Sequence, residues 1–217
     1  MAWERDKPPD VVIGLPHQGE VTVEWMMGFM ELEHPNIYIQ FMRGMPLDEA
    51  RNKIAEKALE LKAKWVFYLD SDTVPPKDCL IRLMSHNLPI VSALYYRRHP
   101  PHIHPAMWRR DPTITDPDAP KYRPITEFPR GALVEADVIG MGCCLISRRV
   151  FEAIKPPWFE WRRRKPFKEV GGLSEDFDFC EKAKAVGSKI LVDTSIVCNH
   201  IGLFKVGEEG KITFMRF

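Results

Sequence analysis

The chain has 217 residues, of which 45% are hydrophobic and 28% charged, as in an ordinary globular protein with a substantial core. Its 31 basic and 30 acidic side chains give a formal net charge of +1, so no overall field directs it to nucleic acid or a membrane. It shows no signal peptide and no apolar run near the roughly 20 residues that span a bilayer. Five cysteines without CxxC spacing predict reduced core thiols, and we expect a cytoplasmic protein.

The first half of the sequence alternates strand-like and helix-like segments. The apolar runs that predict strands are 11–15, 37–41, 65–69 and 90–95. The segments that predict helices are 21–31, 48–62 and 79–86, the second with Ala50, Ile54, Ala58 and Leu61 on one face. Such alternation favours parallel strands joined by helical crossovers. We therefore predict an α/β fold with a mostly parallel central sheet and helices on both faces.

The second half is less regular. Residues 97–130 contain eight prolines, and at that density we expect no regular element but a lid or binding loop. Strand-like runs return at 132–139 and 143–147, and a second loop, 162–172, is basic at its start. The remaining elements are a helix over 174–186 with Ser174 as N-cap and Gly187 at its end, and strands at 189–192 and 196–198. Without repeats or an interdomain linker, we expect a single domain over 1–217 with a short tail, 203–217.

Two carboxylates follow the most apolar strand, where Leu69 is succeeded by Asp70, Ser71 and Asp72. In open parallel sheets, ligands bind at the carboxyl ends of the strands, so both acids are expected on the functional edge. Two acids separated by one small residue suit a hard divalent cation such as Mg²⁺ or Mn²⁺. The alternative is a solvated turn that begins the next helix.

Further polar residues are expected near the same edge. Arg51 and Asn52 lie near the start of the helix predicted over 48–62, from which side chains can reach a nucleotide or phosphate. Gly140 and Gly142 allow a ligand to approach the backbone closely. The others are Glu175, Asp176 and Asp178 in a first helical turn, and His200 after the last apolar run.

Each of these residues also has a structural interpretation. Arg51 could form a surface ion pair, and the two glycines could shape a hairpin. Acids are favoured in a first helical turn by the helix dipole alone, and an isolated histidine is more often structural than a ligand.

The order of these motifs resembles that of the GT-A glycosyltransferases, especially family 2, over about residues 10–203. The motifs are Gly14-Leu15-Pro16, Ala50-Arg51-Asn52, Asp70-Ser71-Asp72, the segment from Gly140 to Arg149, the segment from Ser174 to Cys180, and Asn199-His200. The resemblance implies a single-domain GT-A (Rossmann-like) fold with a small antiparallel portion. It also implies a metal-dependent enzyme that moves a sugar from a nucleotide-diphosphate sugar to an acceptor hydroxyl, with inversion.

The resemblance assigns roles to particular residues. Asp70, Asp72 and His200 would hold Mn²⁺ or Mg²⁺, with Asp70 also near the ribose, and Asp176 would be the catalytic base. Glu175 could position the acceptor, and Asp178 could be structural. The donor would be bound by Leu15, Pro16, Arg51, Asn52, Asp70, Ser71 and Gly142.

The sequence also departs from the family pattern. Family members commonly have an Asp at the end of the second strand to recognise uracil, whereas this chain has Gln40, Phe41, Met42 and Arg43. Little sequence follows His200, so acceptor selection would fall to the long loops. The nucleotide, the sugar, inversion or retention, the oligomeric state and the acceptor, whether glycan, lipid-linked, protein or nucleic acid, stay open.

The loops hold two other groups of residues. His99, His102 and His104 lie among prolines without acidic or cysteine partners at ligand spacing, which favours an acceptor-contacting loop over a metal site. Trp158, Trp161 and the basic run from Arg162 to Lys165 suit a sugar ring, a phosphate or a nucleic acid strand, or form a solvated loop.

Two other functions fit part of the sequence. Asp70 and Asp72 also resemble the first motif of haloacid-dehalogenase phosphatases, with Asp70 as nucleophile, Asp72 as general acid, and Glu175, Asp176 and Asp178 as metal ligands. That motif normally ends the first strand of its fold, and here two strand-helix units precede it. The third hypothesis is a non-catalytic nucleotide or nucleic-acid binding module that uses residues 162–165.

Overall fold

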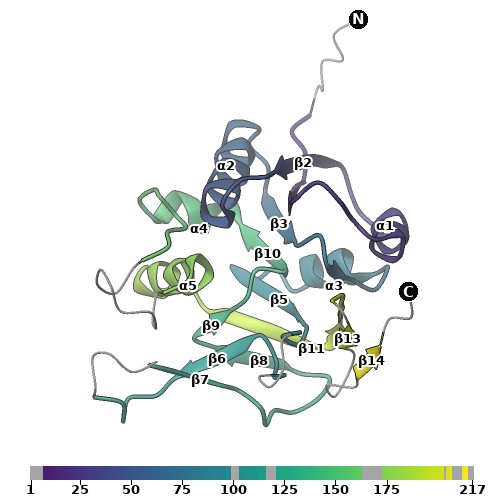
Figure 1. Ribbon diagram of the computed structural model, residues 1–217. Coiled ribbons are helices and arrows are strands. Elements are labelled where there is room, and N and C mark those ends of the chain that lie inside the picture. The colour runs from purple at the N-terminus through teal and green to yellow at the C-terminus, as the bar shows by residue number, and fades with distance from the viewer. Residues whose placement is uncertain are drawn as a thin grey trace, which may run out of the picture.

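The chain is described from a computed structural model, which covers residues 7–98, 103–115, 121–162 and 173–202 and the backbone of two strands at 204–206 and 212–214. Its centre is a seven-stranded sheet with the strand order β2-β1-β3-β10-β5-β11-β8 (Figure 1). Two smaller antiparallel sheets lie beside it. The predicted α/β fold with a mostly parallel central sheet is therefore confirmed.

The first half forms the expected alternation of strands and helices. The elements are β1 (Val11–His17), α1 (Val23–Met30), β2 (Ile37–Arg43), α2 (Leu47–Glu60) and β3 (Trp65–Leu69). Strand β1 pairs in parallel with both β2 and β3. The carboxyl ends of all three strands therefore lie at one edge of the sheet.

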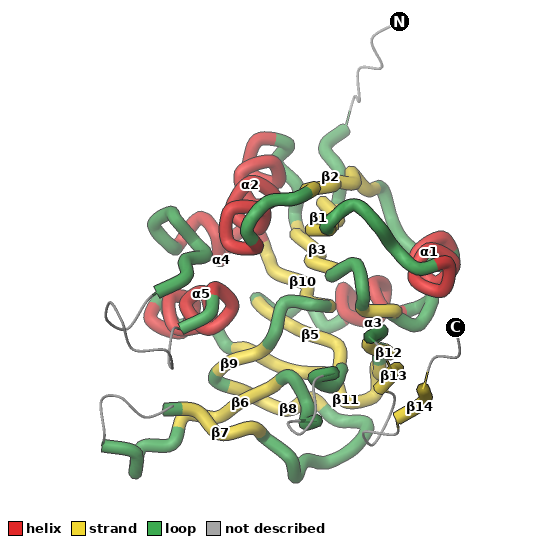
Figure 2. Tube along the Cα trace, in the orientation of Figure 1, coloured by secondary structure: helices red, strands yellow, loops and turns green. Residues whose placement is uncertain are grey.

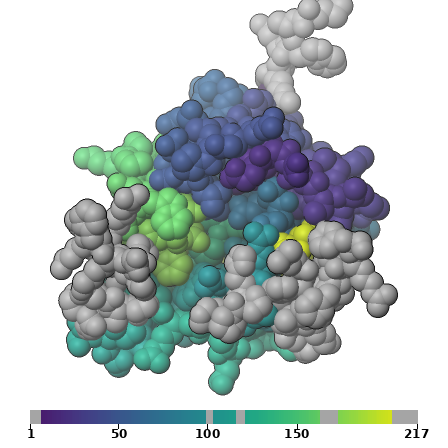
Figure 3. Space-filling model, viewed as in Figure 1, coloured from purple at the N-terminus to yellow at the C-terminus, as the bar shows by residue number. Residues whose placement is uncertain are grey.

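Helices cover both faces of the central sheet, as the sequence predicts. Side chains of α2, α4 (Arg148–Ala153) and α5 (Glu175–Ala185) pack on one face, and those of α1 and α3 (Cys79–Ser85) on the other. Because side chains alternate along a strand, Tyr68 and Cys144 face the first layer while Phe67 and Cys143 face the second. Figure 3 shows the first layer, where the blue segment of α2 lies next to the green segments of α4 and α5.

The second half completes the sheet by long-range pairing. Strand β10 (Cys143–Ser147) runs antiparallel between β3 and β5 (Ile90–Leu94), and β11 (Ile190–Val197) runs parallel to β5. The prediction of separate strands at 189–192 and 196–198 was wrong, because β11 continues through a register shift between Asp193 and Val197. A bulge of this kind keeps one strand paired although its alternation is broken.

Residues 132–139 were also predicted as one strand, and this was wrong. They form β8 (Leu133–Ala136), which pairs with β11, and β9 (Val138–Ile139), which pairs with β6 in another sheet. The break falls at Asp137, whose side chain accepts a hydrogen bond from the backbone N–H of Arg110 and contacts Lys184. One strand-like run in the sequence therefore contains a change of strand partner.

The Pro-rich segment contains strands that the sequence analysis excluded. They are β6 (Met107–Arg110) and β7 (Tyr122–Pro124), in the antiparallel order β7-β6-β9 at the end of the molecule opposite α2 (Figure 2). Residues 106–111 contain no proline, which allows β6 to pair on both sides. Pro124 ends an edge strand, where its missing N–H costs no ladder bond.

The other small sheet has the order β14-β13-β12-β4. Its strands are β4 (Thr73–Val74), β12 (Asn199–His200), β13 (Phe204–Val206) and β14 (Ile212–Phe214). The pairing of His200 with Thr73 places strand β12 beside the Asp70–Asp72 turn. No helix in the described part of the chain is long and apolar enough to cross a bilayer.

Candidate active site

Asp70 and Asp72 lie where β3 ends, and backbone hydrogen bonds fix the turn that contains them. The Asp70 N–H donates to the Gly142 carbonyl at 2.9 Å, and the Asp70 carbonyl accepts from Trp25 Nε1 at 2.9 Å. The Asp72 carbonyl accepts from the Ile201 N–H at 2.7 Å. Three segments distant in the sequence therefore hold the acidic turn at the edge of the sheet.

Arg51 connects Asp70 to Glu175 and is almost fully buried. Its Nη2 lies 3.2 Å from Asp70 Oδ1, and its Nη1 contacts Glu175 Oε1. Both Arg51 and Glu175 are at most 3% exposed. One guanidinium thus compensates two carboxylates that come from β3 and from the first turn of α5.

Asp72 contacts a different pair of residues. Its Oδ2 lies 2.8 Å from Arg98 Nη1, and its Oδ1 lies 3.4 Å from His200 Nε2. Arg98 also donates from Nη1 to the carbonyl of Ile201 at 2.7 Å. The two aspartates of the motif therefore have separate cationic partners.

The acids of this cluster outnumber the cations that contact them. Burial raises the pKa of Glu175 to about 7, although Arg51 opposes the shift and Asp176 adds to it. Burial also raises the pKa of Asp70 against the effect of Arg51, with Asp72 contributing to the rise. For Asp72, burial favours the neutral acid, but His200 and Arg98 lower its pKa below the usual value. Added positive charge would stabilise the ionised forms of Asp70 and Glu175.

The contact between His200 and Asp72 has two features that are typical of the protein ligands of a metal ion. His200 Nδ1 lies 2.8 Å from the carbonyl oxygen of Tyr96, which can only accept, so Nδ1 carries the proton. In a neutral imidazole, Nε2 then carries a lone pair, 3.4 Å from Asp72 Oδ1, which is buried and forms no hydrogen bond within the described residues. Metal-binding histidines commonly donate their other N–H to a carbonyl in this way. A cation at this position would interact with both lone pairs.

The structure does not gather the whole predicted metal set. Asp72 and His200 lie together, whereas the Asp70 carboxylate contacts Arg51. The donors nevertheless suit Mn²⁺ or Mg²⁺, because they are carboxylate oxygens and an imidazole nitrogen. One of these oxygens, Asp72 Oδ1, is buried and has no hydrogen-bond partner among the described residues. Asp72 and His200 would hold such an ion, with Asp70 beside them.

Asp176 lies half-buried in the first turn of α5. Ser174, at the N-cap position, donates from Oγ to Asp176 Oδ1, so the hydroxyl orients the carboxylate instead of capping the helix backbone. Asp176 is close enough to Arg51, Glu175 and Tyr95 to affect their pKa values. Within the described part of the chain, Asp176 forms no ion pair, and it is more open to solvent than Glu175.

Gly140 and Gly142 leave the space that the Tyr95 hydroxyl occupies. A Cβ at Gly140 would lie 2.1 Å from the Tyr95 hydroxyl, and one at Gly142 would lie 3.0 Å from it. The Gly142 N–H donates to Tyr95 Oη at 3.0 Å. Contact between Gly142 and a donor sugar stays a prediction.

Two of the expected donor-binding residues are engaged within the protein. Asn52 donates from Nδ2 to the Phe159 carbonyl at 2.7 Å and accepts from the N–H groups of Trp158 and Phe159. Leu15 is 1% exposed and packs in the core below α1 and α3. Asn52 thus anchors the 158–159 segment, and Leu15 could offer only backbone atoms to a ligand. Pro16 and Ser71 lie at strand ends on the same edge.

Asp178 is separate from the cluster. It is fully buried, and its carboxylate forms ion pairs with Arg162 and with Lys182 Nζ, the latter at 2.6 Å. This placement agrees with a structural role for Asp178. Arg162 is thereby neutralised within the protein, Trp158 is buried, and Trp161 is 50% exposed.

The histidine loop and the basic loop are described only in part. His104 Nδ1 lies 2.8 Å from the Pro105 carbonyl, and its ring packs edge-on against Trp108. His99, His102, Arg163, Arg164 and Lys165 lie outside the described residues.

Sequence reasoning missed Arg98 and Tyr95 as members of this site. Both follow β5, whose carboxyl end lies at the same edge of the sheet as that of β3. The signal was available, because every parallel strand contributes the residues after its end to this edge. Only the pairing of β10 with both β3 and β5 shows that these two ends are close.

Comparisons with known proteins support the fold. No family model matches the chain, and no curated protein matches it. Among solved structures, A197 from STIV superposes with a TM-score of 0.65 and 17% identity, over 95% of this chain and 94% of that one. GalNAc-T7, crystallised with UDP, GalNAc and Mn²⁺, superposes with a TM-score of 0.54 and 14% identity over 92% of this chain. This chain spans 45% of the GalNAc-T7 chain. The chain therefore has a GT-A-like α/β fold, similar to that of a glycosyltransferase.

Proposed function

We propose that this protein is a metal-dependent glycosyltransferase that moves a sugar from a nucleotide-diphosphate sugar to an acceptor hydroxyl with inversion. The observation that carries the proposal is the cluster of Asp70, Asp72 and Glu175 with Arg51 and His200 at the carboxyl edge of the sheet. The fold likeness to GalNAc-T7, whose structure holds UDP, GalNAc and Mn²⁺, supports it independently of these contacts.

The charge of the cluster suits a donor that carries a diphosphate. A bound Mn²⁺ or Mg²⁺ would stabilise the negative charge that develops on the diphosphate leaving group. Asp72 and His200 supply the donor atoms for that ion, and Arg98 places a further cation beside Asp72. Arg51 holds Asp70 in position from the buried side. Carboxylates alone would repel a diphosphate, so the cations of this edge are essential to the proposal.

Asp176 is the proposed catalytic base. An acceptor hydroxyl is a weak nucleophile at neutral pH, so a carboxylate must take its proton as the new bond forms. Asp176 is more exposed than Glu175, and Ser174 fixes one of its oxygens. Glu175, whose carboxylate contacts Arg51, would act by positioning the guanidinium and not by touching the acceptor.

The nucleotide base would lie at the ends of β1 and β2, beside Pro16. Phe41 is 56% exposed there, and its ring lies 6.0 Å from that of His17. These rings offer a stacking surface in place of the acid that family 2 members use for uracil. The five free, buried cysteines agree with a reducing compartment, and we propose a cytoplasmic location on that basis.

The two rival functions gain less support from the geometry. A phosphatase would need Asp178 near Asp70, and Asp178 instead pairs with Arg162 and Lys182. A nucleic-acid module based on residues 162–165 would need Arg162 free, and it is neutralised by the same acid.

The test is a donor screen with the full chain. Nucleotide sugars of each base are incubated with and without Mn²⁺, and release of the nucleoside diphosphate is measured for the wild type, Asp72→Asn and Asp193→Asn. Asp193 is a buried acid bonded to His86, away from the cluster, and serves as the matched control. We expect metal-dependent turnover that Asp72→Asn abolishes and Asp193→Asn retains.

Three outcomes would contradict the proposal. Equal turnover by the wild type and Asp72→Asn would exclude the metal role of Asp72. Trapping of an aspartyl-phosphate at Asp70 from a simple phosphoester would favour the phosphatase. Absence of turnover with every donor, together with salt-dependent oligonucleotide binding, would favour the binding module.

A further inference from the structure

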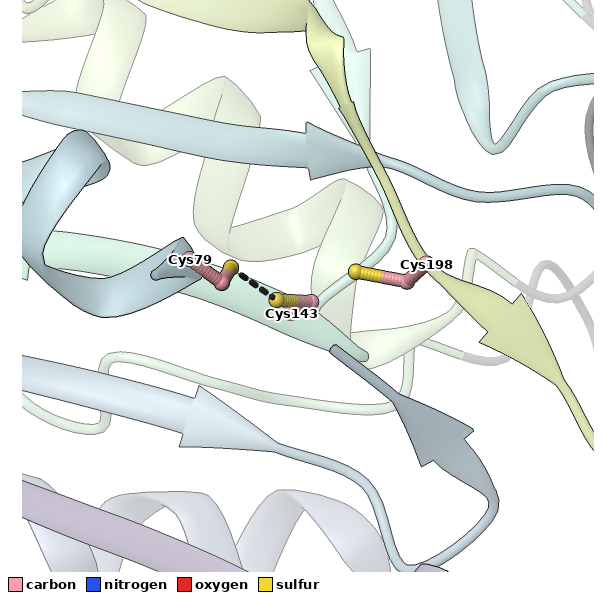
Figure 4. Close-up of side chains that lie close together, drawn as sticks. All are labelled: Cys79, Cys143 and Cys198. Carbon is pink, nitrogen blue, oxygen red and sulfur yellow. Dashed lines mark hydrogen bonds between the residues drawn. The ribbon is translucent and has the colours of Figure 1, made fainter. Parts of the chain in front are cut away.

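Three of the five cysteines meet at one point in the core. The Sγ atoms of Cys79, Cys143 and Cys198 all lie within 4.8 Å of one another, and those of Cys79 and Cys143 are 3.5 Å apart. Figure 4 shows the three side chains directed toward one another from three separate elements. Cys79 begins α3, Cys143 begins β10, and Cys198 joins β11 to β12.

The surroundings of this thiol cluster are apolar. All three residues are fully buried in the core cluster between the sheet and helices α1 and α3. In the described part of the chain, no histidine or carboxylate oxygen belongs to the group. The site thus offers three sulfurs and no hard donor, in contrast to the oxygen-rich edge around Asp72.

The spacing of the sulfurs matches that of ligands to one ion. Metal–sulfur bonds are about 2.3 Å long, so three sulfurs around one ion are separated by about 4 Å. Soft thiolates select Cu⁺, Zn²⁺ and similar thiophilic ions over Mg²⁺ or Mn²⁺. We propose that Cys79, Cys143 and Cys198 form a structural site for one thiophilic d¹⁰ cation, distinct from the metal position at Asp72 and His200.

Binding would exchange protons for the ion. Hydrogen bonds among the three thiols and their burial together raise the pKa of all three, so without a metal they are neutral and pack as small apolar groups. Each sulfur that coordinates loses its proton to solvent as the metal–sulfur bond forms, with no change of oxidation state.

The position of the site gives it a structural consequence. Cys143 pairs with Leu69, which precedes Asp70, and follows Gly142, whose carbonyl accepts the Asp70 N–H. Cys198 lies two residues before His200, and its own N–H donates to Leu94 at 2.8 Å. An ion at the three sulfurs would therefore link β10, α3 and the β11–β12 junction directly beneath the candidate active site.

The test uses Cd²⁺ as the probe, on the reduced full chain under anaerobic conditions. We expect one equivalent to give a sulfur-to-metal charge-transfer absorption and a rise in Tm. Cys79→Ser, Cys143→Ser and Cys198→Ser should each lose both signals. Cys144→Ser and Cys180→Ser should keep them, because these two buried thiols lie in the core of the opposite layer.

A second measurement does not depend on how the variants fold. X-ray absorption of the Cd²⁺-loaded wild type should show a shell of three sulfurs. A shell of oxygen and nitrogen, no charge-transfer absorption, or equal loss in the Cys144→Ser and Cys180→Ser controls would overturn the proposal. So would a Cys79–Cys143 disulfide in protein prepared under reducing conditions. Asp72→Asn should bind Cd²⁺ at the thiols as the wild type does, which separates this site from the proposed catalytic metal.

Discussion

The first turn of α5 carries two buried acids, Glu175 and Asp178, whose charges are compensated in different ways. Glu175 shares Arg51 with Asp70, and Asp176 adds a third carboxylate to the same guanidinium field. Asp178, three residues after Glu175, forms ion pairs with both Arg162 and Lys182, which also lie near Glu181 and Glu160, respectively. A carboxylate paired directly with two cations stabilises the fold, whereas a group of acids that shares one guanidinium can take up further positive charge. Charge compensation therefore distinguishes the candidate active-site acids of α5 from Asp178, which stabilises the fold.

The largest expected effect is on activity, at Asp176. Asp176→Asn removes the proposed base and keeps the shape of the side chain, so turnover of a metal-dependent donor and acceptor pair should fall by about 10²–10⁴-fold. Stability should change little, because the residue is half-buried and the Asn can still accept from Ser174. Steady-state kinetics beside a urea unfolding curve measures both quantities. Retained kcat would remove Asp176 from the mechanism.

The next effect is on stability, at Arg51. Arg51→Met leaves Asp70 and Glu175 buried without their cation, and we expect a loss of about 3–5 kcal/mol in the free energy of unfolding. Denaturant unfolding at pH 7 measures it, and Arg51→Lys should recover part of the loss. A change below about 1 kcal/mol would show that water or protonation already compensates these acids.

A smaller loss of stability is expected at Asp178. Asp178→Asn weakens contacts with Arg162 and Lys182, whose side chains are 45% and 21% exposed and can be hydrated. We expect a loss of about 1–3 kcal/mol, the range for hydrogen bonds to charged groups and their desolvation. Donor turnover should stay at the wild-type level. Lost turnover in a folded variant would show that Asp178 belongs to the active site and does not only stabilise the fold.

The smallest effect is a pH dependence at Asp193. Burial favours the neutral acid, but hydrogen bonds from Ser195 and His86 lower the pKa of Asp193 below its ordinary 3.8. A lowered folded-state pKa stabilises the protein above the ordinary pKa, and this contribution is lost as the pH falls below 3.8 through the folded value.

The measurement is the difference in unfolding free energy between the wild type and Asp193→Asn across the acid range. The difference should be constant between about pH 5 and 7 and should shrink below the ordinary pKa. A difference that grows on acidification would give the shift the opposite sign.

The first half of the fold was predictable because its contacts follow chain order. Strands β1, β2 and β3 are each joined by one helix, and apolar runs of strand and helix period mark all five elements. The later elements depend on distant partners. The split of residues 132–139 between two sheets and the strands β6 and β7 in a Pro-rich segment leave no periodic signal, because pairing and not pattern defines them.

The sequence by itself determined the fold class and placed Asp70, Asp72, Asp176 and His200 near strand ends or helix starts, since alternation and strand composition fix which ends share an edge. Only the tertiary structure decided which cation each acid contacts. It assigned Arg51 to Asp70 and Glu175, Arg98 to Asp72, and two cations to Asp178, and it brought three cysteines from distant segments together. The reason is physical: charge compensation and sulfur spacing depend on ångström distances between segments that sequence order does not encode.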